Sequence, residues 1–302
     1  WCLQSHRKQF TTSKATSKHF QVAKTQPSYV QLRPCWKQGV SRLQEPCLAH
    51  LCNNREKLNQ EHDTKAVRLL TIALIYYEDA MYLQRHLNSW IKLSAETLSK
   101  VTFAIVDDGS TFHTAADTIR VLSDTLERIP RLDIVLLQIH QDLPWNIGGA
   151  RNLVASTVTT RYFFLTDADI MFPNESFEFL FEIMLIAEQY RVKTGVETVF
   201  TSFPRKMGNL SNPIDKPHPA LMPISTKAYW AAGGCDEDFV GHYGSTDPHF
   251  RWRLSHTQNV RKIEVSKAYV HAPILTQIKE EGGKRLERNK THNSILFEKK
   301  RL

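Results

Sequence analysis

Apolar residues in the middle of the chain occur in short runs that alternate with amphipathic stretches. Residues 67–76 are almost continuously apolar, which is typical of a strand buried on both faces of a parallel sheet. Residues 80–93 then carry apolar side chains at helical spacing. Further strands are predicted at residues 101–106, 132–139 and 162–165, and further helices at residues 115–129 and from residue 148.

This alternation of strands and helices predicts βαβ units. The expected fold is therefore α/β, with a doubly wound, Rossmann-like and mostly parallel sheet flanked by helices. After residue 172 the pattern is less regular, with helices predicted at residues 176–190, 227–232 and 246–254, and strands at residues 196–202 and 261–270. Residues 204–219 are rich in Gly, Pro and Asn and predict a loop.

The polar composition of residues 1–64 predicts an N-terminal extension or stem in front of the folded part. Residues 65–302 are expected to form one domain, with one half at residues 65–173 and the other at residues 174–302. Hydrophobic residues make up 41% of the 302 residues, which is enough for a substantial core and excludes a globally disordered chain.

Positive charge is concentrated at the two ends of the chain, whose formal charge is +8 at pH 7. Lys and Arg outnumber Asp and Glu by ten to four in residues 1–64 and by eight to four in residues 279–302. Between these flanks the count is 21 basic against 23 acidic residues. A nucleic-acid-binding domain would be expected to carry the basic charge itself, so we expect no nucleic-acid partner.

Four carboxylates lie where predicted strands end. Asp107 and Asp108 follow one strand, and Asp167 and Asp169 follow another. Ligands of doubly wound sheets bind at the carboxyl ends of the strands. Side chains two residues apart on a strand point the same way, so Asp167 and Asp169 are expected to converge on one point. Two converging carboxylates favour a hard divalent cation such as Mg²⁺ or Mn²⁺.

Glycines precede the helix that is predicted to start near residue 148. Gly148 and Gly149 allow the backbone to approach a ligand closely. The helix N-terminus that follows favours a phosphate group. Arg151, in its first turn, is a candidate contact for a base or diphosphate, with an ordinary surface ion pair as the alternative.

Taken together, six motifs resemble those of family 2, GT-A-fold glycosyltransferases, in order and in approximate spacing. The resemblance extends from about residue 67 to residue 271, and the C-terminal half is also similar to galactosyltransferase-like members. The motifs are Tyr76-Tyr77-Glu78-Asp79, Val106-Asp107-Asp108-Gly109-Ser110, Asn146-Ile147-Gly148-Gly149-Ala150-Arg151-Asn152, Asp167-Ala168-Asp169, Gly233-Gly234-Cys235-Asp236-Glu237-Asp238-Phe239 and Gly244-Ser245-Thr246-Asp247.

The resemblance implies a site for a nucleotide-diphosphate sugar, with a UDP-sugar favoured. The residues that it assigns to this donor are Tyr76, Asp107, Asp108, Gly149, Arg151 and Asp167. It implies Mn²⁺ or Mg²⁺ as cofactor, held by Asp167 and Asp169, with Asp169 as the more direct ligand. His271 is the expected third ligand because it closes the predicted strand at residues 261–270; a satisfied structural histidine is the alternative.

The resemblance also implies an inverting transfer in which Asp247 is the base that takes the proton of the acceptor hydroxyl. A helix N-terminus favours the charged form of such a carboxylate, which fits an N-cap equally well. The preceding residue is Thr246 where the family has an acid, and this departure bears on acceptor binding. Asp236 and Glu237 are expected to bind the acceptor, with a turn cap as the alternative for Asp236.

The predicted function is thus metal-dependent sugar transfer from a nucleotide-diphosphate donor to a hydroxyl of a glycan, lipid or protein. The alternatives are an inactive sugar- or nucleotide-binding relative, a nucleotidyltransferase and a DxD-type phosphatase. The sequence starts at Trp1, so a leader could be missing; no apolar run is long enough to span a bilayer. Membrane association is expected only through the basic N-terminal region or such a leader. The compartment stays open between the Golgi or secretory lumen and the cytoplasm.

Overall fold

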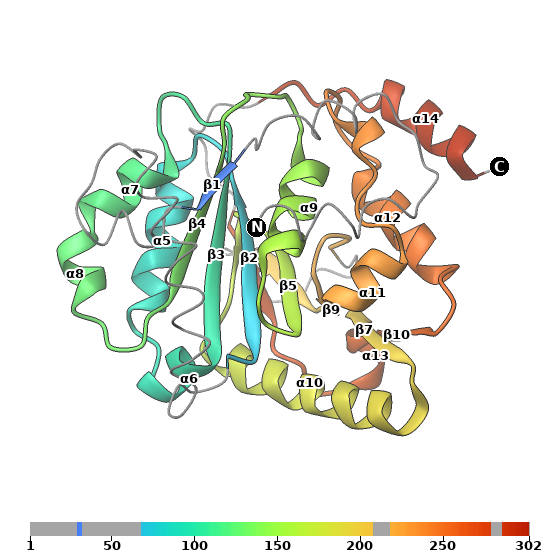
Figure 1. Cartoon of the computed structure of the whole chain (residues 1–302), viewed down its shortest axis with the longest axis horizontal. Coiled ribbons are helices and arrows are strands. Elements are labelled where there is room, and N and C mark those ends of the chain that lie inside the picture. The colour runs from blue at the N-terminus through green and yellow to red at the C-terminus, as the bar shows by residue number, and fades with distance from the viewer. Residues whose placement is uncertain (1–28, 32–67, 208–217, 279–285, 302) are drawn as a thin grey trace, which may run out of the picture.

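The computed structural model describes residues 29–31, 68–207, 218–278 and 286–301. Most of the predicted N-terminal extension, and most of the predicted loop at residues 204–219, therefore lie outside the described residues. Figure 1 shows a central sheet with α5, α7 and α8 on one side and α9, α11 and α12 on the other. This arrangement confirms the predicted α/β class.

The described residues form a six-stranded central sheet in the order β1-β4-β3-β2-β5-β9. Its four inner strands are parallel, as predicted, and β1 and β9 pair antiparallel at the two edges. The strands are β1 (Tyr29–Gln31), β2 (Leu70–Tyr76), β3 (Val101–Asp108), β4 (Ile134–Ile139), β5 (Tyr162–Asp167) and β9 (Met222–Ser225). The sequence analysis predicted neither edge strand.

Both faces of this sheet are buried, which explains why the inner strands are continuously apolar. Leu70 and Ile72 of β2 belong to one hydrophobic cluster, whereas Ala73 of the same strand belongs to the other. The first cluster packs against α5 and α10, and the second against α9, α11 and α12. A strand with only one buried face would instead alternate between apolar and polar residues.

Helices cover the first half of the sheet largely where the sequence predicted them. The sequence analysis did not predict the helix Ala95–Lys100, and in place of the helix predicted at residues 115–129 the chain forms two helices with a break at Leu122. The amide of Leu122 donates to the carbonyl of Ile119 at 3.1 Å, a bond that tightens the chain and ends the first helix there. The helices are α5 (Ala80–Trp90), α6 (Ala95–Lys100), α7 (Ala115–Val121), α8 (Ser123–Glu127) and α9 (Ile147–Thr157).

Two small sheets complete the fold. One pairs β7 with β10 in parallel, and the other has the order β6-β11-β8. The elements of this half are β6 (Ile170–Met171), α10 (Glu175–Thr194), β7 (Glu197–Thr201), β8 (Arg205–Met207), α11 (Thr226–Ala231), η2 (Glu237–Phe239), α12 (Thr246–Ser255), β10 (Val260–Glu264), α13 (Val265–Ala268), β11 (Leu275–Gln277) and α14 (Thr291–Arg301). No helix in the described ranges is long and apolar enough to cross a membrane.

The strand predicted at residues 261–270 is wrong beyond its first part. β10 ends at Glu264, and the chain continues as the helix α13. Val270 is 94% exposed, so the apolar residues after β10 do not extend a buried strand. His271 is exposed in the turn that follows α13, and it therefore does not end a strand at the sheet edge.

Candidate functional site

Acidic residues gather where β3 and β5 end at the same edge of the central sheet. Asp107 and Asp108 are the last residues of β3, and Asp167 is the last residue of β5. Asp169 lies in the turn between β5 and β6. Because β2 pairs in parallel with both β3 and β5, these ends lie at the same edge of the sheet, on either side of β2.

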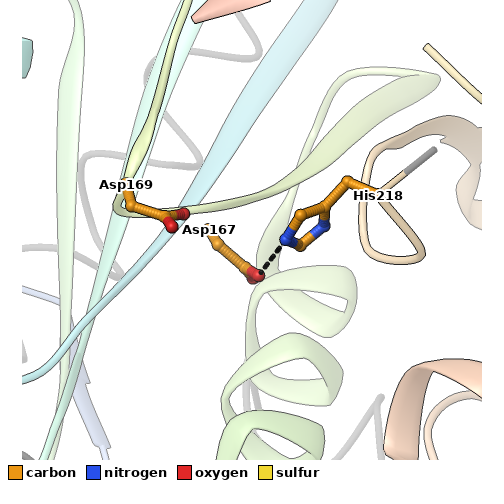
Figure 2. A group of neighbouring side chains, drawn as sticks. All are labelled: Asp167, Asp169 and His218. Carbon is orange, nitrogen blue, oxygen red and sulfur yellow. Dashed lines mark ion pairs between the residues drawn. The ribbon is translucent and has the colours of Figure 1, made fainter. Parts of the chain in front are cut away.

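Asp167, Asp169 and His218 form the one group of at least three His, Cys, Asp or Glu side chains, among the described residues, that could hold a metal ion. Each offers one ligand atom, and these atoms all lie within 4.8 Å of one another. Figure 2 shows the imidazole of His218 turned toward Asp167, and His218 Nε2 lies 3.5 Å from Asp167 Oδ2. The structure thus brings the two predicted carboxylate ligands together with a histidine that the sequence analysis did not name.

His218 reaches the carboxylates because it precedes the edge strand β9. Met222, the first residue of β9, is paired with Leu165 near the end of β5. The segment before β9 therefore approaches the carboxyl end of β5, where Asp167 lies. Burial lowers the pKa of His218, although the charge of Asp167 opposes this shift, and a neutral imidazole is the form that binds metals.

His271, the predicted third ligand, is exposed beyond α13 and is not in the group with Asp167 and Asp169. Its placement rested on the strand that was predicted to end at residue 270, whereas β10 ends at Glu264. Ligation by His271 therefore stays a prediction from the resemblance. His218, in contrast, follows a stretch rich in Gly, Asn and Pro that gave no periodic signal.

Asp169 has the environment expected of a metal ligand. Its Oδ1 is buried and has no hydrogen-bond partner among the described residues, whereas its Oδ2 accepts from Gln277 Nε2 at 2.7 Å. Burial and then the charge of Asp167 raise the pKa of Asp169 to about 6. A buried carboxylate oxygen without a partner is costly, and a divalent cation between the two carboxylates would stabilise it. The donor set of two carboxylates and one imidazole suits Mn²⁺.

The backbone around this pair is fixed by a buried histidine. His86 of α5 is 1% exposed, and its Nε2 lies 2.8 Å from the carbonyl oxygen of Ala168, between the two aspartates. A carbonyl only accepts, so Nε2 donates this bond. Burial lowers the pKa of His86 to about 4, which keeps the ring neutral near pH 7. The sequence analysis missed His86 because it lies on the buried face of an ordinary amphipathic helix.

Arg151 connects Asp167, a predicted metal ligand, with Asp247, the predicted base. Its side chain is 1% exposed, and its guanidinium donates to Asp247 and, at 2.9 Å, to Asp167 Oδ1. Arg151 lies on α9, Asp247 on the first turn of α12, and Asp167 at the end of β5. The planar fork of an arginine suits such a double contact. Arg151 is thus engaged with two acidic side chains rather than with the surface.

The two aspartates at the end of β3 are buried and differ in their contacts. Asp107 is 1% exposed, and its two oxygens accept from the amides of Ser110 at 2.9 Å and Ala115 at 2.7 Å. Asp108 accepts from Asn146 Nδ2 at 2.8 Å. Burial raises the pKa of Asp107, and it raises the pKa of Asp108 to about 7. Asp107 therefore stabilises the loop that follows β3, while Asp108 contacts Asn146, the residue before α9.

Tyr76 and Gly149 serve the fold in this structure. Tyr76 is fully buried, its hydroxyl donates to the carbonyl of His113, and burial raises its pKa. The Tyr76 hydroxyl is thus committed to the loop that carries His113. A Cβ on Gly149 would lie 2.2 Å from Asn146 Oδ1, so the close approach that requires glycine here is to Asn146. Their roles in donor binding stay predictions from the resemblance.

The two predicted acceptor residues lie on η2 or cap it. Asp236 Oδ1 accepts from the amide of Asp238 at 3.1 Å, and its Oδ2 lies 2.8 Å from Lys300 Nζ. Glu237 Oε1 accepts from Asn152 Nδ2 at 2.7 Å. The turn cap that was weighed for Asp236 is therefore present. Acceptor binding by both residues stays a prediction.

Comparison with known proteins bears on this site. Residues 71–190 match the sequence model of the family described as Glycosyl transferase family 2. Over this segment the chain is similar to family 2 glycosyl transferases. The segment runs from β2 into α10, and it contains Asp107, Asp108, Arg151, Asp167 and Asp169. His218 and Asp247 lie outside it.

A solved structure with a TM-score of 0.50 supports the GT-A fold. S. aureus TarS 1–349 in complex with UDP-GlcNAc is 13% identical over 71% of this chain, with a TM-score of 0.50. The mannosyltransferase PcManGT from Pyrobaculum calidifontis, in complex with GDP-Man and Mn²⁺, is 13% identical over 75% of this chain, with a TM-score of 0.47. The chain spans 59% of the first protein and 64% of the second. Comparison with curated proteins gave no match.

Proposed function

We propose that this protein is a metal-dependent glycosyltransferase that moves a sugar from a nucleotide-diphosphate donor to an acceptor hydroxyl. The observation that carries the proposal is the group of Asp167, Asp169 and His218 at the end of β5, whose two aspartates lie within the family 2 segment. These residues would hold a divalent cation, which would supply positive charge to neutralise the leaving diphosphate. The unpartnered Oδ1 of Asp169 supports this assignment.

A UDP-sugar is the donor class to test first. TarS, whose structure has the same fold, holds UDP-GlcNAc in its complex. In this chain Asp108 ends β3 beside Asn146, which opens α9. Carboxylate and amide groups at such a sheet edge accept and donate the hydrogen bonds that a nucleoside needs. Asp108 and Asn146 are therefore the proposed nucleoside contacts.

Asp247 is the proposed base. The carboxylate lies in the first turn of α12, where the helix dipole favours its charged form. Arg151 holds it toward Asp167, so the base faces the side on which the diphosphate would lie. As the acceptor oxygen bonds to the anomeric carbon and the bond to the diphosphate breaks, the hydroxyl proton passes to Asp247. This geometry favours inversion at the anomeric carbon.

An inactive nucleotide-binding relative is the second candidate. The observation that favours it is Thr246, which stands where the family has an acidic residue just before the base. Thr246 is 6% exposed, however, and its Cγ2 would lie 3.3 Å from a Cβ placed on Gly148, so the side chain packs against α9. An acid at this position would be buried against the helix, and its absence removes no exposed acceptor contact. The retained Asp247 also favours turnover.

The test is release of free nucleotide from a panel of UDP- and GDP-sugars with Mn²⁺, with and without EDTA. We expect EDTA-sensitive release from one donor. Asp169→Ala should abolish it without unfolding the protein, whereas Asp124→Ala, at an exposed position on α8, should not change it.

Normal release by Asp169→Ala would refute the metal assignment. If the wild type releases no nucleotide, calorimetry tests whether the donor site is present. Where Mn²⁺ binds with UDP or GDP, turnover on addition of an acceptor would support the transferase, and no turnover with any acceptor would support the inactive relative. Loss of both release and Mn²⁺–nucleotide binding would overturn the proposed function.

A further inference from the structure

The turn at residues 241–245 leads directly into α12 and hence to Asp247. Three of its residues have left-handed backbone angles, with φ of 94° at Gly241, 92° at Gly244 and 64° at Ser245. Glycine adopts such angles at little cost, but Ser245 does not. Ser245 is also the N-cap of α12 and makes no side-chain cap hydrogen bond. A strained residue of this kind persists only where its surroundings hold it.

Asn293 of the C-terminal helix α14 makes the contacts that hold this turn. The side chain is 0% exposed, and its Nδ2 donates to the carbonyls of Phe239, His242 and Gly244 at 2.9, 2.6 and 2.9 Å. Asn293 Oδ1 is buried and has no partner among the described residues. The amide group is therefore committed to three backbone carbonyls of one segment, on both sides of Gly241.

The other end of α14 is anchored to the same segment. Lys300 Nζ lies 2.8 Å from Asp236 Oδ2 and 2.7 Å from Asp238 Oδ2. Between the two anchors, the ring of Phe297 meets the ring of His249 of α12 edge-on at 5.9 Å. Figure 1 shows α14 beside α12 at the end of the chain. Residues 236–249 are thus held along the length of α14.

The geometry points to α14 as a positioning element for the acceptor side of the site, with Asn293 as the positioning residue for Asp247. This inference rests on the proposed function, because it assigns α14 a purpose only if Asp247 acts on an acceptor. Asn293 fixes the carbonyl of Gly244, Ser245 starts α12, and Asp247 lies two residues further on. None of these contacts involves Asp167, Asp169 or His218. The donor group should therefore be independent of α14.

Displacement of a catalytic group by about 1 Å reduces turnover by as much as roughly 100-fold. We expect Asn293→Ala and Asn293→Asp to lower the kcat for sugar transfer to the acceptor substrate by roughly 10- to 100-fold. The alanine variant lacks the side-chain N–H groups, and the aspartate variant places a carboxylate oxygen against three carbonyl oxygens. The affinity for Mn²⁺–UDP should stay within about twofold of the wild type. Ser294→Ala, at an exposed neighbouring position, should match the wild type.

Lys300→Met provides a second test if the Asn293 variants fail to fold, because Lys300 is only partly buried, at 25% exposure, in the last turn of α14. Its matched control is Lys299→Met, whose side chain is exposed. We expect Lys300→Met, but not Lys299→Met, to lower acceptor kcat by about tenfold. A parallel loss of Mn²⁺–UDP affinity would mean general damage and would overturn the positioning role.

Amide hydrogen exchange separates this inference from the proposed function, because it needs no activity. Peptides that cover residues 239–249 should exchange faster in Asn293→Ala and Lys300→Met, while peptides that cover residues 162–171 should not change. Unchanged exchange at residues 239–249 in the folded variants would overturn the inference, whatever the wild type catalyses. Faster exchange together with an inactive wild type would place the failure in the proposed function instead.

Discussion

Replacement of Arg151 by methionine tests whether one buried guanidinium holds the site together. The variant keeps an unbranched apolar stem but removes the charge and both hydrogen bonds. Asp167 and Asp247, whose side chains are 24% and 19% exposed, would then face each other without a cation between them. Asp169 adds a further carboxylate beside Asp167.

The expected loss of stability is about 3 kcal/mol. Removal of one partner from a buried ion pair costs about 3–5 kcal/mol. The low end applies here, because both carboxylates retain some contact with water. Arg151 Nε is buried without a partner in the described residues, so its removal offsets part of the cost. For a domain of this size, about 3 kcal/mol corresponds to a fall in Tm of roughly 6–12 °C.

The assay is thermal and urea unfolding of Arg151→Met with and without Mn²⁺. A cation bound at Asp167 and Asp169 replaces part of the missing charge, so Mn²⁺ should raise the Tm of the variant more than that of the wild type. Arg120→Met is the control: Arg120 pairs with Asp117, but the two side chains are 55% and 53% exposed. Such a surface pair is worth about 0–1 kcal/mol. Equal stability of the two variants would refute the reasoning.

Two further predictions concern single side chains of the site. Burial raises the pKa of Asp108 from 3.8 to about 7, so the folded state binds a proton that the unfolded state lacks between these pH values, and stability falls as pH rises through this window. Asp108→Asn should flatten this pH profile and raise the free energy of unfolding above pH 7 by up to about 4 kcal/mol, measured by urea unfolding. The same variant should bind nucleotide more weakly. An unchanged pH profile would contradict the burial of a charged Asp108. His218→Ala should weaken Mn²⁺ binding in calorimetry by at least about tenfold, and His271→Ala should not; the reverse order would restore His271 as the ligand.

The sequence predicts well those elements whose buried side chains form a continuous or periodic apolar pattern along the chain. β2 and β3 are buried on both faces, so their apolar runs stand out without any knowledge of their neighbours. β6 and β11 have two and three residues and exist because they pair with each other across a long stretch of chain. No local pattern encodes such a pairing. The strand predicted before His271 failed for the opposite reason: a local apolar pattern was present, but it is not buried, and Val270 is 94% exposed.

The candidate site divides in the same way. Asp167 and Asp169 could be predicted, since their spacing and their place after a strand are local features. Gln277, which donates to Asp169, and His218 could not, because each reaches the pair through a strand pairing between distant segments. Arg151 was assigned to the donor, but its partner Asp247 lies 96 residues away in sequence. The packing of α12 against α9 is needed to show that the Arg151 guanidinium pairs with Asp247.

The position of Arg151 has a consequence for how the two halves of the site cooperate. One guanidinium pairs with Asp167, a proposed metal ligand, and with Asp247, the proposed base. A cation at Asp167 would weaken the ion pair between that carboxylate and Arg151, because both positive charges would compete for the same oxygens. Arg151 would then interact more strongly with Asp247 and keep the base ionised and in place. Metal affinity and acceptor turnover should therefore change together in Arg151→Met, whereas Asn293→Ala should change turnover alone.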